Sequence, residues 1–192
     1  MSTFLIVTGA SRGIGRAIAL TAAQKIDNLH VCLLSRNLND LQSTKELIKE
    51  TTKNTSLVSP SCHQIDLGDL ESLSQKMEEV VDDASVAKYE KAILISNAGS
   101  LGYVGPSSGL ASLEGLRKSI DLNITSSIWL SSWFLRLFGK ADKKCTIVNI
   151  SSLCAIEPFP TMGVYCSAKG KYFSKELKFT EYWANDTTIL QY

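Results

Sequence analysis

Short apolar runs alternate with longer amphipathic stretches along the whole chain. The apolar runs lie at residues 4–7, 31–34, 92–95, 146–150 and 187–190, and residues 59–65 predict a weaker strand. Apolar positions at helical spacing lie between them, at residues 14–23, 37–53, 70–81, 113–138 and 164–183. Strands that alternate with helices in this way are typical of βαβ units. The pattern predicts an α/β fold with three layers and a doubly wound parallel sheet of about six strands.

Nothing in the pattern divides the chain into parts. It has 192 residues, of which 44% are hydrophobic, which is enough for one sizeable core. Residues 99–109, rich in Gly, Ser and Pro, form the clearest loop, and there is no internal repeat or linker. The sequence predicts a single domain over residues 1–192.

The charge pattern excludes several classes of partner. Twenty Lys and Arg balance nineteen Asp and Glu, giving a net charge of +1 without long blocks of one sign. This distribution predicts no nucleic-acid partner and no anionic membrane surface. No apolar stretch reaches the roughly 20 residues that span a bilayer, and no basic leader precedes the first strand. We expect a soluble, cytoplasmic protein whose partner is a small molecule.

Cysteine and histidine are too sparse and too scattered for a metal site. Five cysteines show no CxxC spacing, and the chain has two histidines. An odd number of cysteines without paired spacing also argues against a disulfide framework. We therefore expect no bound metal.

The first strand runs into a glycine-rich turn with the spacing G-x-x-x-G-x-G, residues 9–15. Glycines between a buried strand and a helix let the backbone turn tightly and approach a pyrophosphate at the helix N-terminus. The alternative is a tight βα turn without a ligand. On the first interpretation the cofactor contacts here are Gly9, Ser11, Arg12, Gly13, Ile14 and Gly15.

The residues after the second and third strands refine the choice of cofactor. An acid after the second strand would favour NAD, but this chain has Ser35 and Arg36, so Arg36 and Arg12 could grip a 2′-phosphate. This predicts NADP(H); the alternative is two solvated arginines. Asp66 and Leu67 follow the third strand, where Asp66 would meet the adenine or act only as a helix N-cap.

Four further groups have the order and spacing of a known family. Asn97-Ala98-Gly99 follows the fourth strand, Asn123 lies in the long helix, Ser151-Ser152 follows the fifth strand, and Tyr165 with Lys169 opens the next helix. The chain thereby resembles the short-chain dehydrogenase/reductase family, which implies a Rossmann-type NAD(P)-binding domain. It also implies a nicotinamide-dependent oxidoreductase acting on CH–OH or carbonyl groups.

The spacing of Tyr165 and Lys169 has a mechanical reason. Residues i and i+4 share one helix face, and an ammonium there favours a tyrosinate that otherwise forms near pH ~10. We expect Tyr165 to protonate a carbonyl oxygen during reduction by NADPH, Ser152 to donate to the developing oxyanion, and Lys169 to hold the nicotinamide ribose. The resemblance implies that Asn123 binds a water linking Lys169 to solvent. Asn97, Ala98 and Gly99 would border the cofactor.

Residues 96–102, 149–159 and 163–166 look like those of sepiapterin reductases, which reduce side-chain carbonyls of pterins in tetrahydrobiopterin biosynthesis; some of their relatives accept other α-dicarbonyls. By this analogy Leu153 and Cys154 would line the substrate site with Ser152 and Tyr165, or else only pack beside the sheet. Two alternatives remain: a general carbonyl or hydroxysteroid-type reductase, and an inactive truncated cofactor-binding or interaction fragment.

The end of the chain departs from the family pattern. Residues 187–192 align with the sixth strand, after which the family continues into a substrate loop and a seventh strand. We expect the C-terminal substrate-binding part, including the acid that anchors a pterin, to be missing. The resemblance also implies a homodimer through the helices at residues 113–138 and 164–183. Trp129 and Trp133 would lie in that interface or pack inside the monomer.

Overall fold

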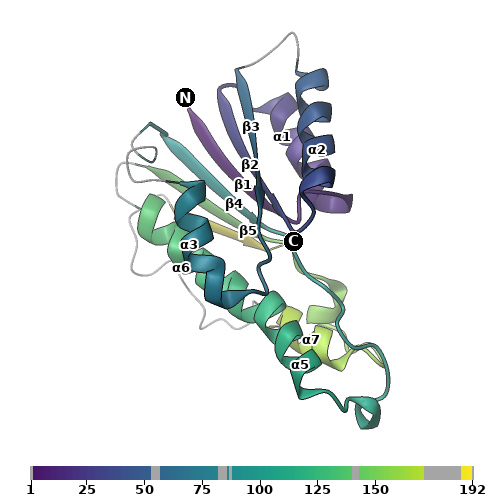
Figure 1. Ribbon diagram of the computed structural model, residues 1–192. Coiled ribbons are helices and arrows are strands. Elements are labelled where there is room, and N and C mark those ends of the chain that lie inside the picture. The colour runs from purple at the N-terminus through teal and green to yellow at the C-terminus, as the bar shows by residue number, and fades with distance from the viewer. Residues whose placement is uncertain are drawn as a thin grey trace.

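The computed structural model describes residues 2–52, 57–81, 86, 88–139, 143–170 and 187–191, and in them the chain forms one parallel sheet (Figure 1). Its strands are β1 (Thr3–Thr8), β2 (Leu29–Ser35), β3 (Val58–Gln64), β4 (Lys91–Ser96), β5 (Lys144–Asn149) and β6 (Thr187–Gln191). They lie in the order β3-β2-β1-β4-β5-β6, and every neighbouring pair is parallel. The predicted sheet of about six parallel strands is confirmed.

Helices cover both faces of this sheet. The helices are α1 (Gly13–Lys25), α2 (Leu38–Thr51), α3 (Leu70–Val80), α5 (Leu113–Ile120), α6 (Ser126–Phe138) and α7 (Gly163–Gly170). Figure 1 shows α1 and α2 on one face and α3 and α6 on the other. Of the helix expected at residues 164–183, the part after Gly170 lies outside the described residues. Within the part of the chain that the structure describes, no helix is both long and apolar enough to cross a membrane.

The two faces follow from the alternation of side chains along each strand. Phe4 and Ile6 of β1 pack in a core with α3 and α6, whereas Leu5 and Val7 pack in a second core with α1 and α2. Successive residues of a strand point to opposite faces, so a strand covered on both sides must be apolar throughout. All six residues of β1 are buried and the four between Thr3 and Thr8 are apolar, which explains why this strand is predictable from a short uninterrupted apolar run.

The long helical pattern at residues 113–138 is not one regular α-helix. A π-helical turn, Asp121–Thr125, separates α5 from α6, and the backbone N–H of Ser126 donates to the carbonyl oxygen of Asp121. Such turns insert one extra residue into a helix and often occur at functional sites. Asn123 lies inside this turn and is buried. The helix expected at residues 113–138 is present without a break, and the π-helical turn is an irregularity that the sequence did not predict.

Trp133, near the end of the same pattern, belongs to the core. Its side chain is 6% exposed and joins the cluster under α3 and α6, while the half-buried Trp129 packs against that cluster. The two indole rings stack with their centroids 6.4 Å apart. Of the two expectations for these side chains, packing inside the monomer holds for Trp133.

The strand order reverses between β1 and β4. From β1 the chain moves outward to β2 and β3, and from β4 it moves outward in the other direction to β5 and β6. Loops leaving two such strands diverge, and the crevice between them at the carboxyl ends is where ligands bind in open α/β sheets. The fold therefore places a binding site beside the ends of β1 and β4.

Candidate functional site

The glycine-rich turn after β1 packs directly against the end of β4. Gly9 has a φ of +66°, and a Cβ on it would lie 2.9 Å from Asn97 Nδ2. A Cβ on the buried Gly15 would overlap the carbonyl oxygen of Gly9 and lie 2.6 Å from Asn97 Nδ2. Only glycine fits at these two positions, because each approaches neighbouring polar atoms too closely for a side chain. The turn is thus held tightly over the switch between β1 and β4.

The amino end of α1 begins at this turn. Arg12 is its N-cap in extended conformation; its side chain makes no capping hydrogen bond within the described structure, and the first turn of α1 contains no acid. The first amides of an α-helix have no partner inside the helix, and the helix dipole makes that end positive. This end suits an anion, in particular a phosphate.

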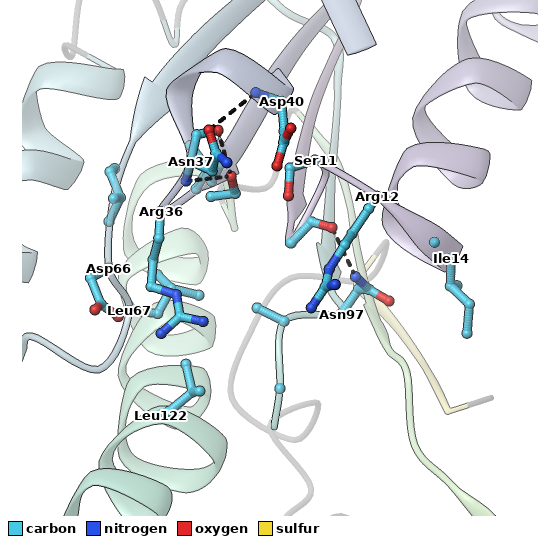
Figure 2. A pocket seen from close by; sticks show the side chains of 17 residues that line it. Ser11, Arg12, Ile14, Arg36, Asn37, Asp40, Asp66, Leu67, Asn97 and Leu122 are labelled. Atoms are coloured by element: carbon cyan, nitrogen blue, oxygen red, sulfur yellow. Dashed lines mark hydrogen bonds between the residues drawn. The ribbon is translucent and has the colours of Figure 1, made fainter. Parts of the chain in front are cut away.

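A cavity of about 630 Å³ opens beside these amides, and Figure 2 shows the side chains around it. Its volume lies in the range of small-molecule sites, roughly 300–1,000 Å³. Twelve of the predicted cofactor residues line it: Gly9, Ser11, Arg12, Gly13, Ile14, Ser35, Arg36, Asp66, Leu67, Asn97, Ala98 and Gly99. Gly15 lies beneath the turn instead, and neither Tyr165 nor Lys169 is among the lining residues.

Two guanidinium groups point into this cavity from different loops. Figure 2 shows Arg12 entering from the turn before α1 and Arg36 from the end of β2. The loop after β2 is fixed by Asn37, whose Oδ1 accepts a hydrogen bond from the backbone N–H of Asp40 at 3.2 Å and so caps α2. Asn37 and Asp40 also line the cavity, although the sequence did not single them out.

Asp66 was expected to contact adenine or to cap the following helix. The N-cap of α3 is Asp69, which accepts from the backbone N–H of Ser72. Asp66 Oδ1 instead accepts from the backbone N–H of Gly68 at 3.0 Å, closing a turn, while the residue lines the cavity. The capping alternative for Asp66 was wrong, because the helix begins three residues later.

Ser152, Tyr165 and Lys169 come together where β5 ends and α7 begins. Ser152 Oγ accepts from the backbone N–H of Cys154 at 3.2 Å and hydrogen-bonds to Tyr165. Lys169 Nζ donates to the carbonyl oxygen of Ile150 at 2.8 Å and lies 5.6 Å from the centroid of the Tyr165 ring. Tyr165 and Lys169 thus lie together on α7, as their spacing predicts, and Ser152 adjoins them from the end of β5.

The pKa of Tyr165 is shifted in the direction opposite to the expected one. Burial raises it above the ordinary value, and the hydrogen bond from Ser152 lowers it by less; Cys154 and Cys166 raise it further. The Lys169 ammonium lies over the ring rather than at the phenol oxygen and is bound to Ile150, and burial lowers its own pKa. Lys169 is not among the groups that shift the Tyr165 pKa, so the expected lowering by Lys169 is not present in this structure.

Asn123 ties the π-helical turn to the loop after β4. Its Nδ2 donates to the carbonyl oxygens of Ser100 and Ser119, both at 2.9 Å, and its Oδ1 accepts from the backbone N–H of Ser100 at 3.0 Å. A Cβ on Gly99 would lie 3.0 Å from Asn123 Oδ1 and 3.7 Å from Lys169 Nζ. Gly99 thus lies between these two side chains, and its lack of a side chain keeps them near one another.

The predicted substrate residues differ in exposure. Leu153 is 51% exposed, whereas Cys154 is 9% exposed and its backbone is held by Ser152. Leu153 is therefore the more accessible of the two, and a substrate-binding role for either side chain stays a prediction. Among the described residues no cluster of three or more His, Cys, Asp and Glu side chains could hold a metal ion.

Several residues that support the site were missed by sequence reasoning. Thr8 Oγ1 accepts from the backbone N–H groups of Asn97 and Ala98, each at 2.9 Å, and donates to Ile95 O at 3.2 Å. A hydroxyl at the carboxyl end of a fully apolar strand is a signal that could have found it. Arg16 carries no such signal, because its partner Thr44 lies 28 residues away in the sequence.

The switch in strand order, the uncapped amino end of α1 and the arginine-lined cavity together define a dinucleotide-binding Rossmann-type protein. The model of the short chain dehydrogenase family matches residues 3–184, so the chain belongs to that family. Its oxidoreductases act on CH–OH and carbonyl groups with a nicotinamide cofactor.

Relatives and solved structures are consistent with this family. The chain is 37% identical over 164 residues to benzil reductase ((S)-benzoin forming) of Bacillus subtilis, covering 85% of this chain and 60% of that protein. It is 34% identical over 169 residues to sepiapterin reductase of Rattus norvegicus, covering 85% and 63%. A short chain dehydrogenase of Shigella flexneri complexed with NADP is similar with a TM-score of 0.70 and 27% identity, covering 88% of this chain and 66% of that one. The chain thus spans less than two thirds of the length of these two relatives.

Proposed function

We propose that the chain is the NADPH-binding and proton-transfer part of a carbonyl reductase that acts on ketones attached to aromatic ring systems. The observation that carries this proposal is the group Ser152, Tyr165 and Lys169 at the same sheet edge as a cavity with two arginines. We also propose that residues 1–192 form one Rossmann-type domain of that reductase.

The cavity fits a dinucleotide with an additional phosphate. Gly13 has a φ of +56°, and a Cβ on it would meet no atom within 4 Å, so the turn is open toward the cavity. The amides at the start of α1 would hold the pyrophosphate, and Arg12 and Arg36 would hold a 2′-phosphate, the group that distinguishes NADPH from NADH. Ser35 would assist at the ribose, and Asp66 with Leu67 would border the adenine.

When bound, the nicotinamide supplies a hydride to the carbonyl carbon. Tyr165 gives its phenolic proton to the carbonyl oxygen, and Ser152 donates a hydrogen bond to the negative charge that develops there. Tyr165 is protonated at neutral pH, as an ordinary phenol is, and burial shifts its pKa further upward; the protonated form is the one that reduction needs. Lys169 would turn from Ile150 toward the nicotinamide ribose, and Asn123 would hold a water behind it.

Apolar side chains favour a substrate with a large hydrophobic group. Leu101 and Val104, in the loop after β4, are 44% and 48% exposed, and Leu153 and Ile156, after β5, are 51% and 60% exposed. The two loops are joined by a hydrogen bond from Gly105 N to the carbonyl oxygen of Thr161 at 2.9 Å. Benzil and sepiapterin, in the names of the two relatives, are ketones attached to aromatic systems. We propose that this chain's substrates share that chemistry.

The test is oxidation of NADPH with benzil and with sepiapterin by this chain and by a Tyr165→Phe variant. We expect turnover of at least one ketone, lost in the variant because the proton donor is removed. Tyr89→Phe is the matched control. Tyr89 precedes β4, at the opposite end of the strands from Tyr165, and its ring packs on Phe4. Activity that survives in Tyr165→Phe would overturn the catalytic assignment. NADPH binding without turnover of either ketone would favour the inactive cofactor-binding fragment.

A further inference from the structure

A bridge of side chains joins the glycine-rich turn to α2. Arg16, in α1, donates from Nε to Thr44 Oγ1 at 3.1 Å and from Nη2 to the carbonyl oxygen of Ser11. Thr44, in α2, is completely buried, and its hydroxyl lies 3.2 Å from the carbonyl oxygen of Ala10 and 3.1 Å from that of Asp40. We call Arg16 and Thr44 the loop clamp. Two successive carbonyl oxygens of the turn are held by it.

Holding these carbonyl oxygens fixes the direction of the neighbouring amides. The described peptide bonds are trans, and in a trans peptide the C=O and the following N–H point in opposite directions. With Ala10 O and Ser11 O directed to the clamp, the N–H groups of Ser11 and Arg12 point away from it. Ser11 and Arg12 line the cavity, whereas neither clamp residue does. The clamp therefore orients the backbone that carries the Arg12 side chain.

The clamp also connects the two loops that carry Arg12 and Arg36. Arg12 belongs to the glycine-rich turn, and Arg36 lies two residues before α2 begins at Leu38. Because the clamp ties the turn to α2, it limits changes in the separation of the two loops. A phosphate held by two guanidinium groups needs both at a fixed separation, since charge-assisted hydrogen bonds weaken when either group is misplaced. A ligand without that phosphate has no such requirement.

We infer that Arg16 and Thr44 are positioning residues that set the selectivity for NADPH over NADH, acting through Arg12 and Arg36. Neither residue needs to touch the cofactor. The inference rests on the proposed function, because it assumes that the two arginines hold the 2′-phosphate. It predicts that damage to the clamp weakens NADPH binding selectively.

The experiment measures dissociation constants of NADPH and NADH for the full chain and for Thr44→Val and Thr44→Ser. Thr44→Val keeps the shape of the side chain and removes the hydroxyl. We expect the dissociation constant of this variant for NADPH to rise about tenfold, which corresponds to the loss of one charge-assisted hydrogen bond. The dissociation constant for NADH should change by less than about twofold. Thr44→Ser restores the hydroxyl and is expected to restore the selectivity, although it lacks the methyl group.

Thr52→Val is the matched control. Thr52 is also buried, and its hydroxyl donates to the carbonyl oxygen of Ile48 at 2.8 Å, within the same helical segment and away from the turn. This variant is expected to keep the wild-type ratio of the two dissociation constants. Unfolding curves of all variants report any general loss of stability. If Thr44→Val does not fold, Arg16→Lys decides. It keeps the positive charge, but it has one nitrogen in place of the separate Nε and Nη2 that bind Thr44 and Ser11.

The outcomes separate the inference from the proposed function. A wild-type chain that prefers NADPH, with that preference unchanged in Thr44→Val, overturns the clamp alone. Equal weakening of NADPH and NADH in Thr44→Val overturns it too, because it indicates a general structural role. A wild-type chain without preference for NADPH overturns the proposed cofactor, and the clamp with it.

Discussion

Asn97 donates two hydrogen bonds of 2.9 Å to Thr8, one from its backbone N–H to Oγ1 and one from Nδ2 to the carbonyl oxygen. These bonds connect the ends of β4 and β1, the two strands between which the strand order reverses. Where the backbones of β1 and β4 diverge, side-chain hydrogen bonds take the place of the backbone hydrogen bonds between the two strands. The floor of the proposed cofactor site therefore depends on one amide and one hydroxyl.

Replacing Thr8 by valine tests this connection. The change keeps the shape of the side chain but leaves the N–H groups of Asn97 and Ala98 without their acceptor. Two unsatisfied amides predict a loss of about 2–4 kcal/mol in the free energy of unfolding, measured by urea denaturation. Thr8→Ser keeps the hydroxyl and should lose less. Equal stability of Thr8→Val and wild type would contradict this assignment.

The glycines of the turn are expected to respond differently to alanine. At Gly15 a Cβ has no room, so Gly15→Ala should displace the turn and abolish NADPH binding in a titration. At Gly13 a Cβ meets nothing, and the cost is only the strain of the positive φ, about 1–2 kcal/mol. Gly13→Ala should therefore fold with moderately reduced stability. Similar binding by both variants would mean that the turn is looser than its packing indicates.

The Tyr165 phenol should lose its proton only in alkaline solution. Burial raises its pKa above the ordinary 10.0, so the phenol stays protonated through the neutral range and loses its proton only at higher pH. The difference in ultraviolet absorbance between wild type and Tyr165→Phe during an alkaline titration isolates this group. We expect its midpoint above pH 10. A midpoint near neutrality would show that Lys169 governs the tyrosine even without cofactor.

Acid should destabilise the chain through two histidines. His30 and His63 both lie within hydrogen-bond distance of Ser61 Oγ, at 3.3 and 3.0 Å, and burial is the main cause that lowers both pKa values. The nearby Glu79 carboxylate raises the pKa of His63, but by less than burial lowers it. Since the unfolded chain takes up these protons near the ordinary 6.5 and the folded chain only at lower pH, stability falls as pH drops below 6.5.

Urea denaturation at pH 7.5 and pH 5.5 checks this expectation. A His63→Gln variant should lose less stability between the two conditions than wild type, because one of the two protonation sites is gone. Lys25→Gln offers a surface control that should leave the difference nearly unchanged, because Lys25 is exposed in α1 and is not among the groups that shift the pKa of either histidine. An identical loss in His63→Gln and wild type would assign the acid sensitivity to other groups.

Strands β1, β2 and β4 were predictable because they are largely buried on both faces and therefore mostly apolar, whereas β3 is only half-buried and carries several polar residues. β4 illustrates this: the run at residues 92–95 lies inside Lys91–Ser96. The glycine spacing was readable from its place between a buried strand and a helix. Tyr165 and Lys169 were readable through the order and spacing that the chain shares with the family.

The rest depends on contacts between distant segments. The π-helical turn is stabilised by Asn123 bonding to Ser100, 23 residues away in sequence, which no periodicity in residues 113–138 reveals. Asp66 and Asp69 both precede the same helix, so sequence alone could not tell which one caps it. The pKa of Tyr165 depends on where the Lys169 ammonium lies, and that is set by the carbonyl oxygen of Ile150.

The uncapped amino end of α1 has a consequence for the folding equilibrium. A phosphate bound there would supply the hydrogen-bond acceptors that Arg12 does not provide, and would thus complete the helix. A ligand that binds only the folded chain stabilises it by mass action, in proportion to the logarithm of its concentration. The melting temperature of this protein would then rise with the supply of its ligand, and its lifetime against unfolding and proteolysis would follow the same supply.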